Sequence, residues 1–366
     1  MNFTRSSTLS IKFANTGKRV KYESFIDEYM RVAKIALDEI WGWEKIPCLI
    51  DRKLFSNVET FLGQKPLGCL LKQVSGLIRG TRVSARHLKK TASKPEISKI
   101  NPEISPDMID IDWETETSFD GIFRLINIGK AGKHLKIVIP LKKTKHFNKL
   151  LTKGMLKKSC RLSKRGITFI FESDIEERCE GETVGIDVGI ADLWSDSRGV
   201  RSTSIEQRHG WTMSKIMSRL SSRKKGSKNF KQTQDHRDNF IGWSLNRLNF
   251  ENVKELKVED IKNMRKGKKC DRFRSHWSYP KIFRKIEQRS EELGVRVTKI
   301  DPRNTSRKCS SCGAVDIENR RGKVFKCVKC NYTQDADLNA AVNISHVESK
   351  TQHRGVYSPS SKKNSK

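Results

Sequence analysis

Two pairs of cysteines in the last third of the chain constrain its fold more than any other feature. Cys309 and Cys312 form one C-x2-C pair, Cys327 and Cys330 form a second, and fourteen residues separate the pairs. Each C-x2-C turn directs two thiolates towards one point, and two such turns complete a tetrahedron around zinc with Zn–S bonds of about 2.3 Å. Four protein ligands leave no open coordination position. The spacing therefore predicts a structural zinc ion, against the alternative of four unrelated thiols.

The remaining cysteines also favour a metal over a disulfide framework. The chain has nine cysteines, and the five outside the cluster are scattered: Cys48, Cys69, Cys160, Cys179 and Cys270. An odd total with this distribution is not typical of a secreted, disulfide-rich chain. The first 18 residues also lack an apolar stretch of signal-peptide length. We therefore expect a cytosolic or nucleoid protein.

The chain carries a large excess of positive charge. Its 366 residues include 74 Lys and Arg against 42 Asp and Glu, a formal net charge of +32, and only 35% of the residues are hydrophobic. Self-repulsion on this scale destabilises a compact chain unless a polyanionic partner offsets it. Nucleic acid is the first candidate and an anionic membrane surface the second. A membrane span is excluded, because no apolar run approaches the roughly 20 residues that a spanning helix requires.

The first part of the chain combines one strand with two helices. The first ten residues predict a strand, and amphipathic patterns predict helices over 22–41 and 67–90. The second helix ends in basic residues at near-helical spacing: Arg79, Arg82, Arg86, Lys89 and Lys90. Such a run predicts a solvated face or, in a chain of this charge, a face that binds phosphates.

Several short strands follow a linker at 91–106. Strand-like runs occupy 109–119, 121–129 and 133–141, and a hairpin turns at Lys164-Arg165-Gly166. Strands at this spacing predict a small barrel. The barrel can include the N-terminal strand, which would make the helical stretch an insertion.

The second part of the chain alternates strands with helices. Residues 183–202 predict a buried strand, a hairpin turn at Ser197-Arg198-Gly199 and a return strand. Two helical stretches flank a basic segment, which has seven Lys and Arg from Lys215 to Lys231 and no acid. The later patterns predict, in order, a strand at 253–260, a helix that stops at Gly294, a strand at 295–300, a short helix at 335–347 and a disordered basic tail.

Three carboxylates stand at notable positions in these elements. Asp187 lies in the apolar run GIDVG, Glu259 ends the run LKVED, and Asp337 begins the short helix. A carboxylate in an apolar strand is costly unless it is paired, hydrogen-bonded or bound to a metal. Taken singly, Asp187 could bond to a turn, Glu259 could face solvent, and Asp337 or Asp335 could cap the helix. Taken together, the three can converge on one edge of a sheet.

Converging carboxylates are what a divalent-metal nuclease requires. Two Mg2+ ions about 3.5–4 Å apart neutralise a phosphodiester, one by activating water and the other by stabilising the leaving 3′ oxygen. Oxygen ligands suit Mg2+ or Mn2+, whereas thiolates suit zinc. The sequence thus predicts magnesium at Asp187, Glu259 and Asp337 and zinc at the four cysteines.

These motifs, in this order, resemble the RuvC-like nuclease of the TnpB family, which comprises transposon-encoded RNA-guided DNA endonucleases related to compact type V CRISPR effectors. GIDVGIADLWSDSRG resembles the first RuvC motif with Asp187 at the catalytic position, LKVEDIKNM the second with Glu259, and DADLNAAVNI the third with Asp337. DPRNTSRKCSSCG and ENRRGKVFKCVKC resemble the segments on either side of the family's zinc ribbon, and RKKGSKNFK resembles its basic stretch. One departure is Asn331, where the family usually has Gly. Asn tolerates a left-handed conformation, so we expect the turn to survive.

The resemblance covers about residues 184–345 and implies a multidomain fold of α/β and β type. The implied fold has an RNase H-like (RuvC) core with an inserted four-cysteine zinc ribbon, preceded by a wedge-type β-barrel with an inserted helical recognition domain. The implied segments are 1–15 and 101–180 for the barrel, 16–100 for the recognition domain, 181–305 and 334–348 for the core, 306–333 for the ribbon and 349–366 for a disordered basic tail.

The resemblance also implies partners. A guide RNA would lie along the basic surfaces, the protein would read a short motif in double-stranded target DNA, and the displaced single strand would enter the carboxylate site. The side chains expected to contact nucleic acid are Arg320, Lys224, Lys225, Lys228, Arg79, Arg82 and Arg86. For Arg320, the alternative is an exposed arginine of the ribbon loop.

Three functions remain open on this basis. The first is an RNA-guided DNA endonuclease of a prokaryotic cytoplasm or nucleoid, with Mg2+ or Mn2+, structural Zn2+ and a guide RNA. The second is a non-cleaving RNA-guided DNA-binding repressor, as in relatives that have lost catalytic carboxylates. The third is a guide-independent RuvC-like nuclease or transposition accessory protein. The presence of all three carboxylates favours a nuclease, and the +32 charge with the layout of the N-terminal half favours a ribonucleoprotein.

Overall fold

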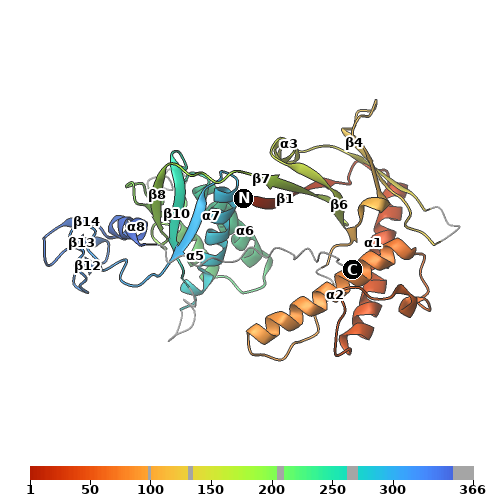
Figure 1. Cartoon of the computed structure of the whole chain (residues 1–366), viewed down its shortest axis with the longest axis horizontal. Helices are drawn as coiled ribbons and strands as arrows, with labels where there is room; N and C mark the ends of the chain where they lie inside the picture. The colour runs from red at the N-terminus through yellow and green to blue at the C-terminus, as the bar shows by residue number, and fades with distance from the viewer. Residues whose placement is uncertain (98–99, 131–134, 204–209, 262–270, 349–366) are drawn as a thin grey trace, which may run out of the picture. The chain divides into compact units, whose positions relative to one another are not determined.

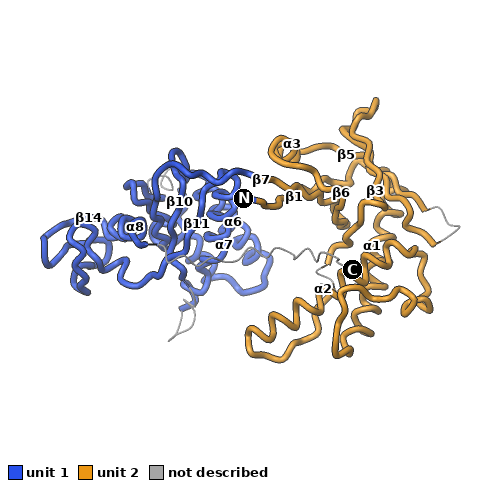
Figure 2. The backbone as a smooth tube through the Cα atoms, viewed as in Figure 1, with its two compact units in different colours: residues 1, 175–366 blue, residues 2–174 orange. Residues whose placement is uncertain are grey.

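The computed structural model describes residues 1–97, 100–130, 135–203, 210–261 and 271–348 of the chain. The chain divides into an N-terminal unit, Asn2–Asp174, and a C-terminal unit formed by Met1 with Ile175–Lys366 (Figures 1 and 2). Each unit has its own hydrophobic core. None of the described helices is long and apolar enough to span a membrane. The predicted tail at 349–366 lies outside the described residues.

The N-terminal unit contains two antiparallel sheets. The four-stranded sheet has the order β1-β7-β6-β2 and the three-stranded sheet the order β3-β4-β5. The strands are β1 (Asn2–Ser10), β2 (Glu103–Ile104), β3 (Ile109–Asp112), β4 (Gly121–Leu125), β5 (Ile137–Leu141), β6 (Met155–Ser163) and β7 (Gly166–Asp174). The strands predicted to form one small barrel are hydrogen-bonded in two sheets, and their closure into a barrel stays a prediction. Both sheets contribute to one core, where Phe123 of β4 packs edge-on against Phe169 of β7 with ring centroids 6.4 Å apart.

The first strand pairs with the last strand of this unit. Asn2 lies opposite Asp174 and Ser10 opposite Gly166, so β1 and β7 pair over their whole length. Gly166 is needed where the strands meet, because a Cβ there would lie 2.2 Å from the backbone oxygen of Leu9. The helical stretch therefore lies, in sequence, between two strands of the same sheet.

Two long helices cover part of the same core. The helices are α1 (Thr16–Trp41), α2 (Gln64–His87) and α3 (Lys145–Leu151), with 3-10 turns η1 (Arg52–Phe55) and η3 (Pro106–Met108). α1 begins six residues before the predicted start, because the Asn15 side chain accepts a hydrogen bond from the backbone N–H of Lys18 at 2.9 Å and caps the helix. Phe25 and Tyr29 of α1 and Leu70 of α2 are fully buried in this core.

The C-terminal unit is built on a mixed sheet with the order β11-β10-β8-β9. β10 is parallel to both β8 and β11, and β9 is antiparallel to β8. The strands are β8 (Glu182–Asp187), β9 (Ser195–Asp196), β10 (Val253–Glu259) and β11 (Arg296–Ile300). The helices are α5 (Met213–Ser221), α6 (Lys228–Leu245), α7 (Tyr279–Glu291) and α8 (Ala336–His346), with a 3-10 turn η5 (Arg274–His276). Figure 1 shows α8 next to β8.

The predicted turn at Ser197-Arg198-Gly199 is present in the structure. Ser195 pairs with Arg201 in an antiparallel bridge across it, and the Ser202 N–H donates to the backbone oxygen of Trp194 at 2.9 Å. The strand before the turn is the short β9, and residues 188–194 connect β8 to β9. The Asp196 side chain organises the turn, since it accepts hydrogen bonds from the backbone N–H groups of Arg198 at 3.1 Å and Val200 at 2.9 Å. The predicted helix stop is confirmed, because Gly294 follows α7 with φ +69°.

A small antiparallel sheet carries the cysteines. Its strands are β12 (Arg320–Arg321), β13 (Val324–Lys326) and β14 (Thr333–Asp335), and β14 leads directly into α8. This segment, with the loops that hold the cysteines, is called the ribbon below. The ribbon lies between β11 and α8 in the chain.

Candidate active site and zinc site

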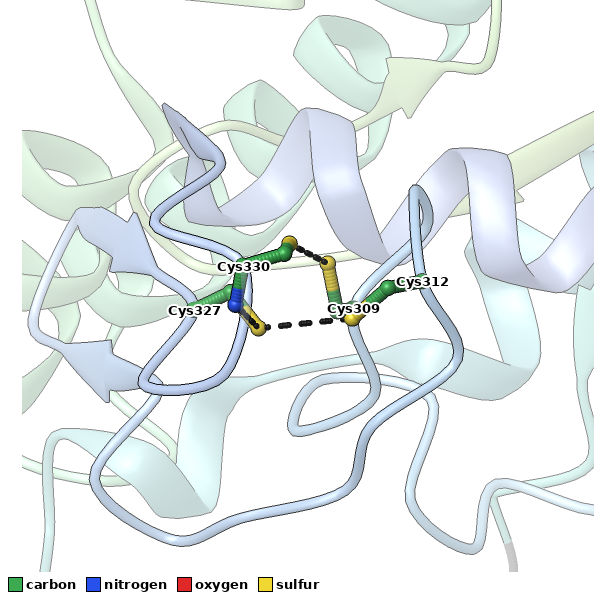
Figure 3. Close-up of side chains that lie close together, drawn as sticks. All are labelled: Cys309, Cys312, Cys327 and Cys330. Carbon is green, nitrogen blue, oxygen red and sulfur yellow. Dashed lines mark hydrogen bonds between the residues drawn. The ribbon is translucent and has the colours of Figure 1, made fainter.

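Four thiols meet at one point in the ribbon. The sulfurs of Cys309 and Cys330 lie 3.7 Å apart, those of Cys312 and Cys327 lie 3.6 Å apart, and all four lie within 4.8 Å of one another (Figure 3). Zinc with Zn–S bonds of about 2.3 Å in a tetrahedron places its sulfurs about 3.8 Å apart, whereas a disulfide requires about 2.05 Å. The donor set and its spacing therefore fit a zinc ion.

Two matching turns bring these sulfurs together. The N–H of Gly313 donates to the backbone oxygen of Cys309 at 2.9 Å, and the N–H of Asn331 donates to that of Cys327 at 3.0 Å. Both closing residues are left-handed, with φ +77° at Gly313 and +58° at Asn331. The expectation that Asn331 preserves the turn is therefore confirmed. A hydrogen bond from the Cys330 backbone N–H lowers the pKa of Cys327 to about 6, which favours the thiolate form that binds metal.

Asp187 and Glu259 end two neighbouring parallel strands. They are the last residues of β8 and β10, and the preceding residues Ile186 and Val258 are partners in the ladder. The carboxyl ends of parallel strands meet at the same edge of a sheet. The register therefore brings these two carboxylates to adjacent positions.

Asp337 reaches the site from the first turn of α8. Asp335 caps this helix, because its side chain accepts hydrogen bonds from the backbone N–H groups of Asp337 at 2.9 Å and Leu338 at 3.2 Å. Of the two candidate caps, Asp335 has that role, and the Asp337 side chain is left for other partners. Asp337 is 6% exposed.

The position of α8 depends on close packing against the sheet. At Gly185 in β8, a Cβ would lie 2.1 Å from the backbone oxygen of Ala341 and 2.5 Å from the backbone nitrogen of Ser345. On β10, the Lys257 ammonium donates to the backbone oxygens of Ser345 at 3.1 Å and Val347 at 2.7 Å. These contacts fix α8 against the two strands that carry the other carboxylates.

The three carboxylates interact electrostatically. Burial, followed by the charges of Glu259 and Asp337, raises the pKa of Asp187 to about 7. Burial also raises the pKa of Glu259, although a hydrogen bond from Thr305 and the charge of Arg320 oppose that shift. The structure thus brings the three predicted carboxylates into one electrostatic cluster.

Sequence analysis missed the residues that orient Glu259. The Thr305 hydroxyl donates to Glu259 Oε1, and the Tyr279 hydroxyl donates to the backbone oxygen of Glu259. Asn343 of α8 in turn donates to the backbone oxygen of Thr305 at 2.9 Å. Thr305 lies within the motif DPRNTSRKCSSCG, so the motif itself was the available signal.

Two cations from the β12–β13 hairpin, Arg320 of β12 and Lys323 of the turn that follows it, face Asp337. An Arg320 guanidinium nitrogen donates to Asp337 Oδ1 at 2.9 Å. The Lys323 ammonium donates to Asp337 Oδ2 and also to Asp192 Oδ2, the latter at 2.8 Å. Arg320 is therefore not simply an exposed loop arginine, and its contact with a scissile phosphate stays a prediction. Lys323 and Asp192 belong to the same cluster and were not predicted.

The two clusters differ in their donors and in how closely the donors gather. Among the described ranges, the four cysteines are the one group of three or more His, Cys, Asp or Glu residues whose ligand atoms all lie within 4.8 Å of one another. The carboxylates offer oxygen donors, which suit Mg2+ or Mn2+. Three acids held in one partly buried cluster repel each other, and a divalent cation would relieve that repulsion. Their chemistry therefore fits a hard cation.

The predicted nucleic-acid contacts fall into two groups. Lys224, Lys225 and Lys228 are exposed at the loop between α5 and α6, and Arg86 is exposed on α2. By contrast, Arg79 donates to Cys48 Sγ at 2.8 Å. Arg82 donates to three backbone oxygens, those of Trp41 at 2.8 Å, Trp43 at 2.8 Å and Glu44 at 3.0 Å. Arg79 and Arg82 thus bind the end of α1 and the segment that follows it, and contact of the α2 basic run with phosphates stays a prediction.

Comparisons with known proteins agree with the motifs. A family model described as Cas12f1-like, TNB domain matches residues 279–344. The CRISPR-associated endodeoxyribonuclease Cas12f1 of Sulfoacidibacillus thermotolerans is 39% identical over 117 residues, which are 32% of this chain and 27% of that protein. A TnpB-like protein of Methanocaldococcus jannaschii is 33% identical over 98 residues, 25% of this chain and 34% of that protein. A cryo-EM structure of a Cas12f1–sgRNA–target DNA complex aligns with 89% of this chain and 81% of that chain at 16% identity and a TM-score of 0.49.

The chain matches 27% and 21% of the length of two Cas12f1 relatives. The aligned part is thus a fraction of those proteins, and the family-model match at residues 279–344 includes the ribbon and most of α8. The resemblance to the TnpB family and to compact type V effectors is confirmed over this matched part, and residues 279–344 match the Cas12f1-like TNB domain.

Proposed function

We propose that this chain is an RNA-guided DNA endonuclease of the TnpB type. It would bind a guide RNA and hydrolyse target DNA with Mg2+ or Mn2+ held by Asp187, Glu259 and Asp337. The relatives include proteins named as CRISPR-associated endodeoxyribonucleases and as TnpB-like proteins, which supports a nuclease. The +32 charge of the chain supports nucleic acid as its partner.

One observation carries the proposal. The Asp187 carboxyl is partly buried at the carboxyl end of a parallel strand, and its desolvation, followed by the charges of Glu259 and Asp337, raises its pKa. A fold gains no stability from clustering three acids, because each disfavours ionisation of the others. Groups with strongly perturbed pKa values cluster at functional sites, so this arrangement supports a catalytic role.

The side chains around the cluster have distinct roles in this proposal. A divalent cation held by the carboxylates would neutralise the phosphodiester and supply a more acidic water. Thr305 would keep the Glu259 carboxylate in one orientation through its hydroxyl hydrogen bond. Arg320, next to Asp337, would contact the phosphate, because a guanidinium donates two parallel hydrogen bonds to phosphate oxygens.

The domain assignment belongs to the same proposal. Residues 181–305 with 334–348 would form the RuvC-like core, 306–333 the zinc ribbon, 1–15 with 101–180 the wedge domain and 16–100 the recognition domain. The exposed lysines 224, 225 and 228 would contact the guide RNA or the target DNA. Double-stranded target DNA with a displaced single strand would be the substrate, in the cytoplasm or nucleoid of a prokaryote.

One purification separates this function from its alternatives. The full chain is expressed with the DNA that flanks its gene, and the RNA that copurifies is sequenced. The ribonucleoprotein is then incubated with Mg2+ and a duplex library that carries the matching target beside randomised sequence. We expect one discrete RNA species and cleavage of matching DNA only.

Other outcomes identify the other candidates. Binding of matching DNA without cleavage indicates the repressor. Cleavage that persists after removal of the RNA indicates a guide-independent nuclease. Random RNA fragments with no matching DNA bound would contradict both guided functions.

A further inference from the structure

Lys323 contacts two carboxylates from different parts of the C-terminal unit. Its ammonium lies 2.8 Å from Asp192 Oδ2 and also donates to Asp337 Oδ2. Asp192 lies between β8 and β9, and Asp337 lies in the first turn of α8. The side chains of Asp192 and Asp337 are 5% and 8% exposed, whereas that of Lys323 is 44% exposed. A solvent-facing cation thus reaches inwards to two buried acids.

Two cations of the β12–β13 hairpin bind both oxygens of Asp337. Arg320 donates to Oδ1 at 2.9 Å and Lys323 donates to Oδ2. A divalent cation that approaches Asp337 therefore meets two fixed positive charges. Because like charges repel strongly where solvent is limited, metal affinity at this carboxylate depends on where the two side chains are held.

Lys323 has a second partner that can hold it away from Asp337. Asp192 is 4% exposed, and its other oxygen accepts a hydrogen bond from the backbone N–H of Thr203 at 3.2 Å, which fixes the carboxylate. A buried carboxylate needs a counter-ion, so Asp192 retains the ammonium even when the contact with Asp337 is lost. Asp192 therefore provides a second resting position within the same site.

We propose that Lys323 is a tethered counter-ion that competes with the divalent metal for Asp337, and that Asp192 holds it when the metal is bound. This inference rests on the proposed nuclease function, because it takes Asp337 as a metal ligand. Without metal, Lys323 neutralises Asp337 and reduces its repulsion with Asp187. With metal, the ammonium remains paired at Asp192. The Asp192–Lys323 pair thereby sets the metal affinity of the site.

Mn2+ binding measures this competition directly, without any cleavage assay. The full chain, purified with its zinc, is titrated with Mn2+, and free Mn2+ is followed by electron paramagnetic resonance. Lys323→Met removes the competitor, so we expect binding about two- to fivefold tighter, the range of a partly exposed ion pair. Asp192→Asn leaves Lys323 with Asp337 alone, so we expect weaker binding by a similar factor.

Two further variants separate competition from a general change in charge. Arg321→Met removes one positive charge from an exposed residue of the same hairpin, and we expect Mn2+ affinity within about twofold of the unmodified chain. In the double variant Lys323→Met with Asp192→Asn, the Lys323 ammonium is absent, so loss of the Asp192 carboxylate can no longer shift that ammonium towards Asp337. The effect of the Asp192 substitution should therefore be much smaller than in the unmodified background.

Failure of the Lys323 competition and failure of the proposed metal site give different results. If Lys323→Met binds Mn2+ no more tightly than Arg321→Met, or if Asp192→Asn tightens binding, Lys323 is not a competitor, and the metal site itself stands. If the unmodified chain shows no Mn2+ binding that Asp187→Ala abolishes, the proposed metal site and this inference both fail. Circular dichroism and zinc content identify variants that misfold. If Asp192→Asn does not fold, the comparison of Lys323→Met with Arg321→Met still decides.

Discussion

The four-cysteine cluster, a candidate zinc site, and the carboxylate cluster of the C-terminal unit reach their geometry in different ways. The cysteines come from one segment, Cys309 to Cys330, and their sulfurs lie within 4.8 Å of one another. The carboxylates come from the ends of β8 and β10 and from α8, and they are coupled through their charges. One site is local in sequence, and the other is assembled by the sheet.

This difference follows from the chemistry of the ligands. Thiols carry less charge than carboxylates at neutral pH, so turns closed by Gly313 and Asn331 are sufficient to gather the four sulfurs. Carboxylates repel one another when they ionise, so the three acids stay near one another only because strand pairing and helix packing hold their backbones. The zinc site should therefore fail when its own residues change, whereas the carboxylate site should also fail when distant packing changes.

The largest effect should come from the carboxylates. Asp187→Ala, Glu259→Ala and Asp337→Ala should each lower the single-turnover cleavage rate at least about a hundredfold, because several kcal/mol of transition-state stabilisation is lost with the cation. Binding of target DNA should survive. Glu255→Gln is the matched control on the same strand, where Thr183 and Thr298 bind the carboxylate, and it should cleave at nearly the unmodified rate. A variant that retains full activity would remove that residue from the catalytic set.

The next effect should come from the zinc ligands. Cys327→Ser should lose about one zinc per chain and unfold the ribbon, because structural zinc contributes folding free energy directly. Zinc analysis and limited proteolysis report both changes. Hydrogen exchange should show that the backbone amides of β8 and β10 are still protected. Cys179→Ser, at an exposed cysteine outside the cluster, should change neither property. A purified unmodified chain without zinc would contradict the assignment.

A smaller change should break the carboxylate site and leave the zinc site intact. At Gly185, an added Cβ would overlap backbone atoms of α8, so Gly185→Ala should cost about 1–3 kcal/mol and displace the helix that carries Asp337. Cleavage should fall while zinc content is unchanged. Gly242→Ala in α6 is the control, since its Cβ would contact only Lys285 Cε at 4.0 Å. If Gly185→Ala cleaves as fast as Gly242→Ala, the packing of α8 does not set the site.

The smallest effect concerns stability and pH in buffer without divalent metal. The pKa of Asp187 is raised to about 7 in the folded chain, above its ordinary value. The contribution of this proton to the free energy of unfolding is present at low pH and is lost as the pH rises towards and through 7. The melting temperature should therefore fall between pH 5 and 8 by a few degrees more in the unmodified chain than in Asp187→Asn. Parallel pH profiles for the two proteins would exclude a raised pKa.

The sequence predicted what is encoded locally. Three predicted features each depend on a few neighbouring residues: the two C-x2-C turns, the helix end at Gly294 and the left-handed conformation of Asn331. The structure has all three. The strand ends at Asp187 and Glu259 were visible as acids at the limits of apolar runs. Their adjacency, in contrast, depends on the parallel pairing of β8 with β10, which no local pattern specifies.

What sequence reasoning missed depends on contacts between distant segments. Lys323 and Asp192 are 131 positions apart, and each reads as an ordinary surface charge until the fold joins them. The division of the N-terminal strands into two hydrogen-bonded sheets was not predicted, because strand periodicity gives the face of a strand and not its partners. The contacts of Arg79 and Arg82 with the segment after α1 were likewise not predicted.

Diffraction from crystals soaked in Mn2+, recorded at the manganese absorption edge, tests the central claim most directly. An anomalous peak is expected within about 2.2 Å of carboxylate oxygens from Asp187, Glu259 and Asp337, with a separate zinc-edge peak among the four sulfurs. Crystals that bind manganese elsewhere on the chain and leave these three carboxylates without a peak would contradict it.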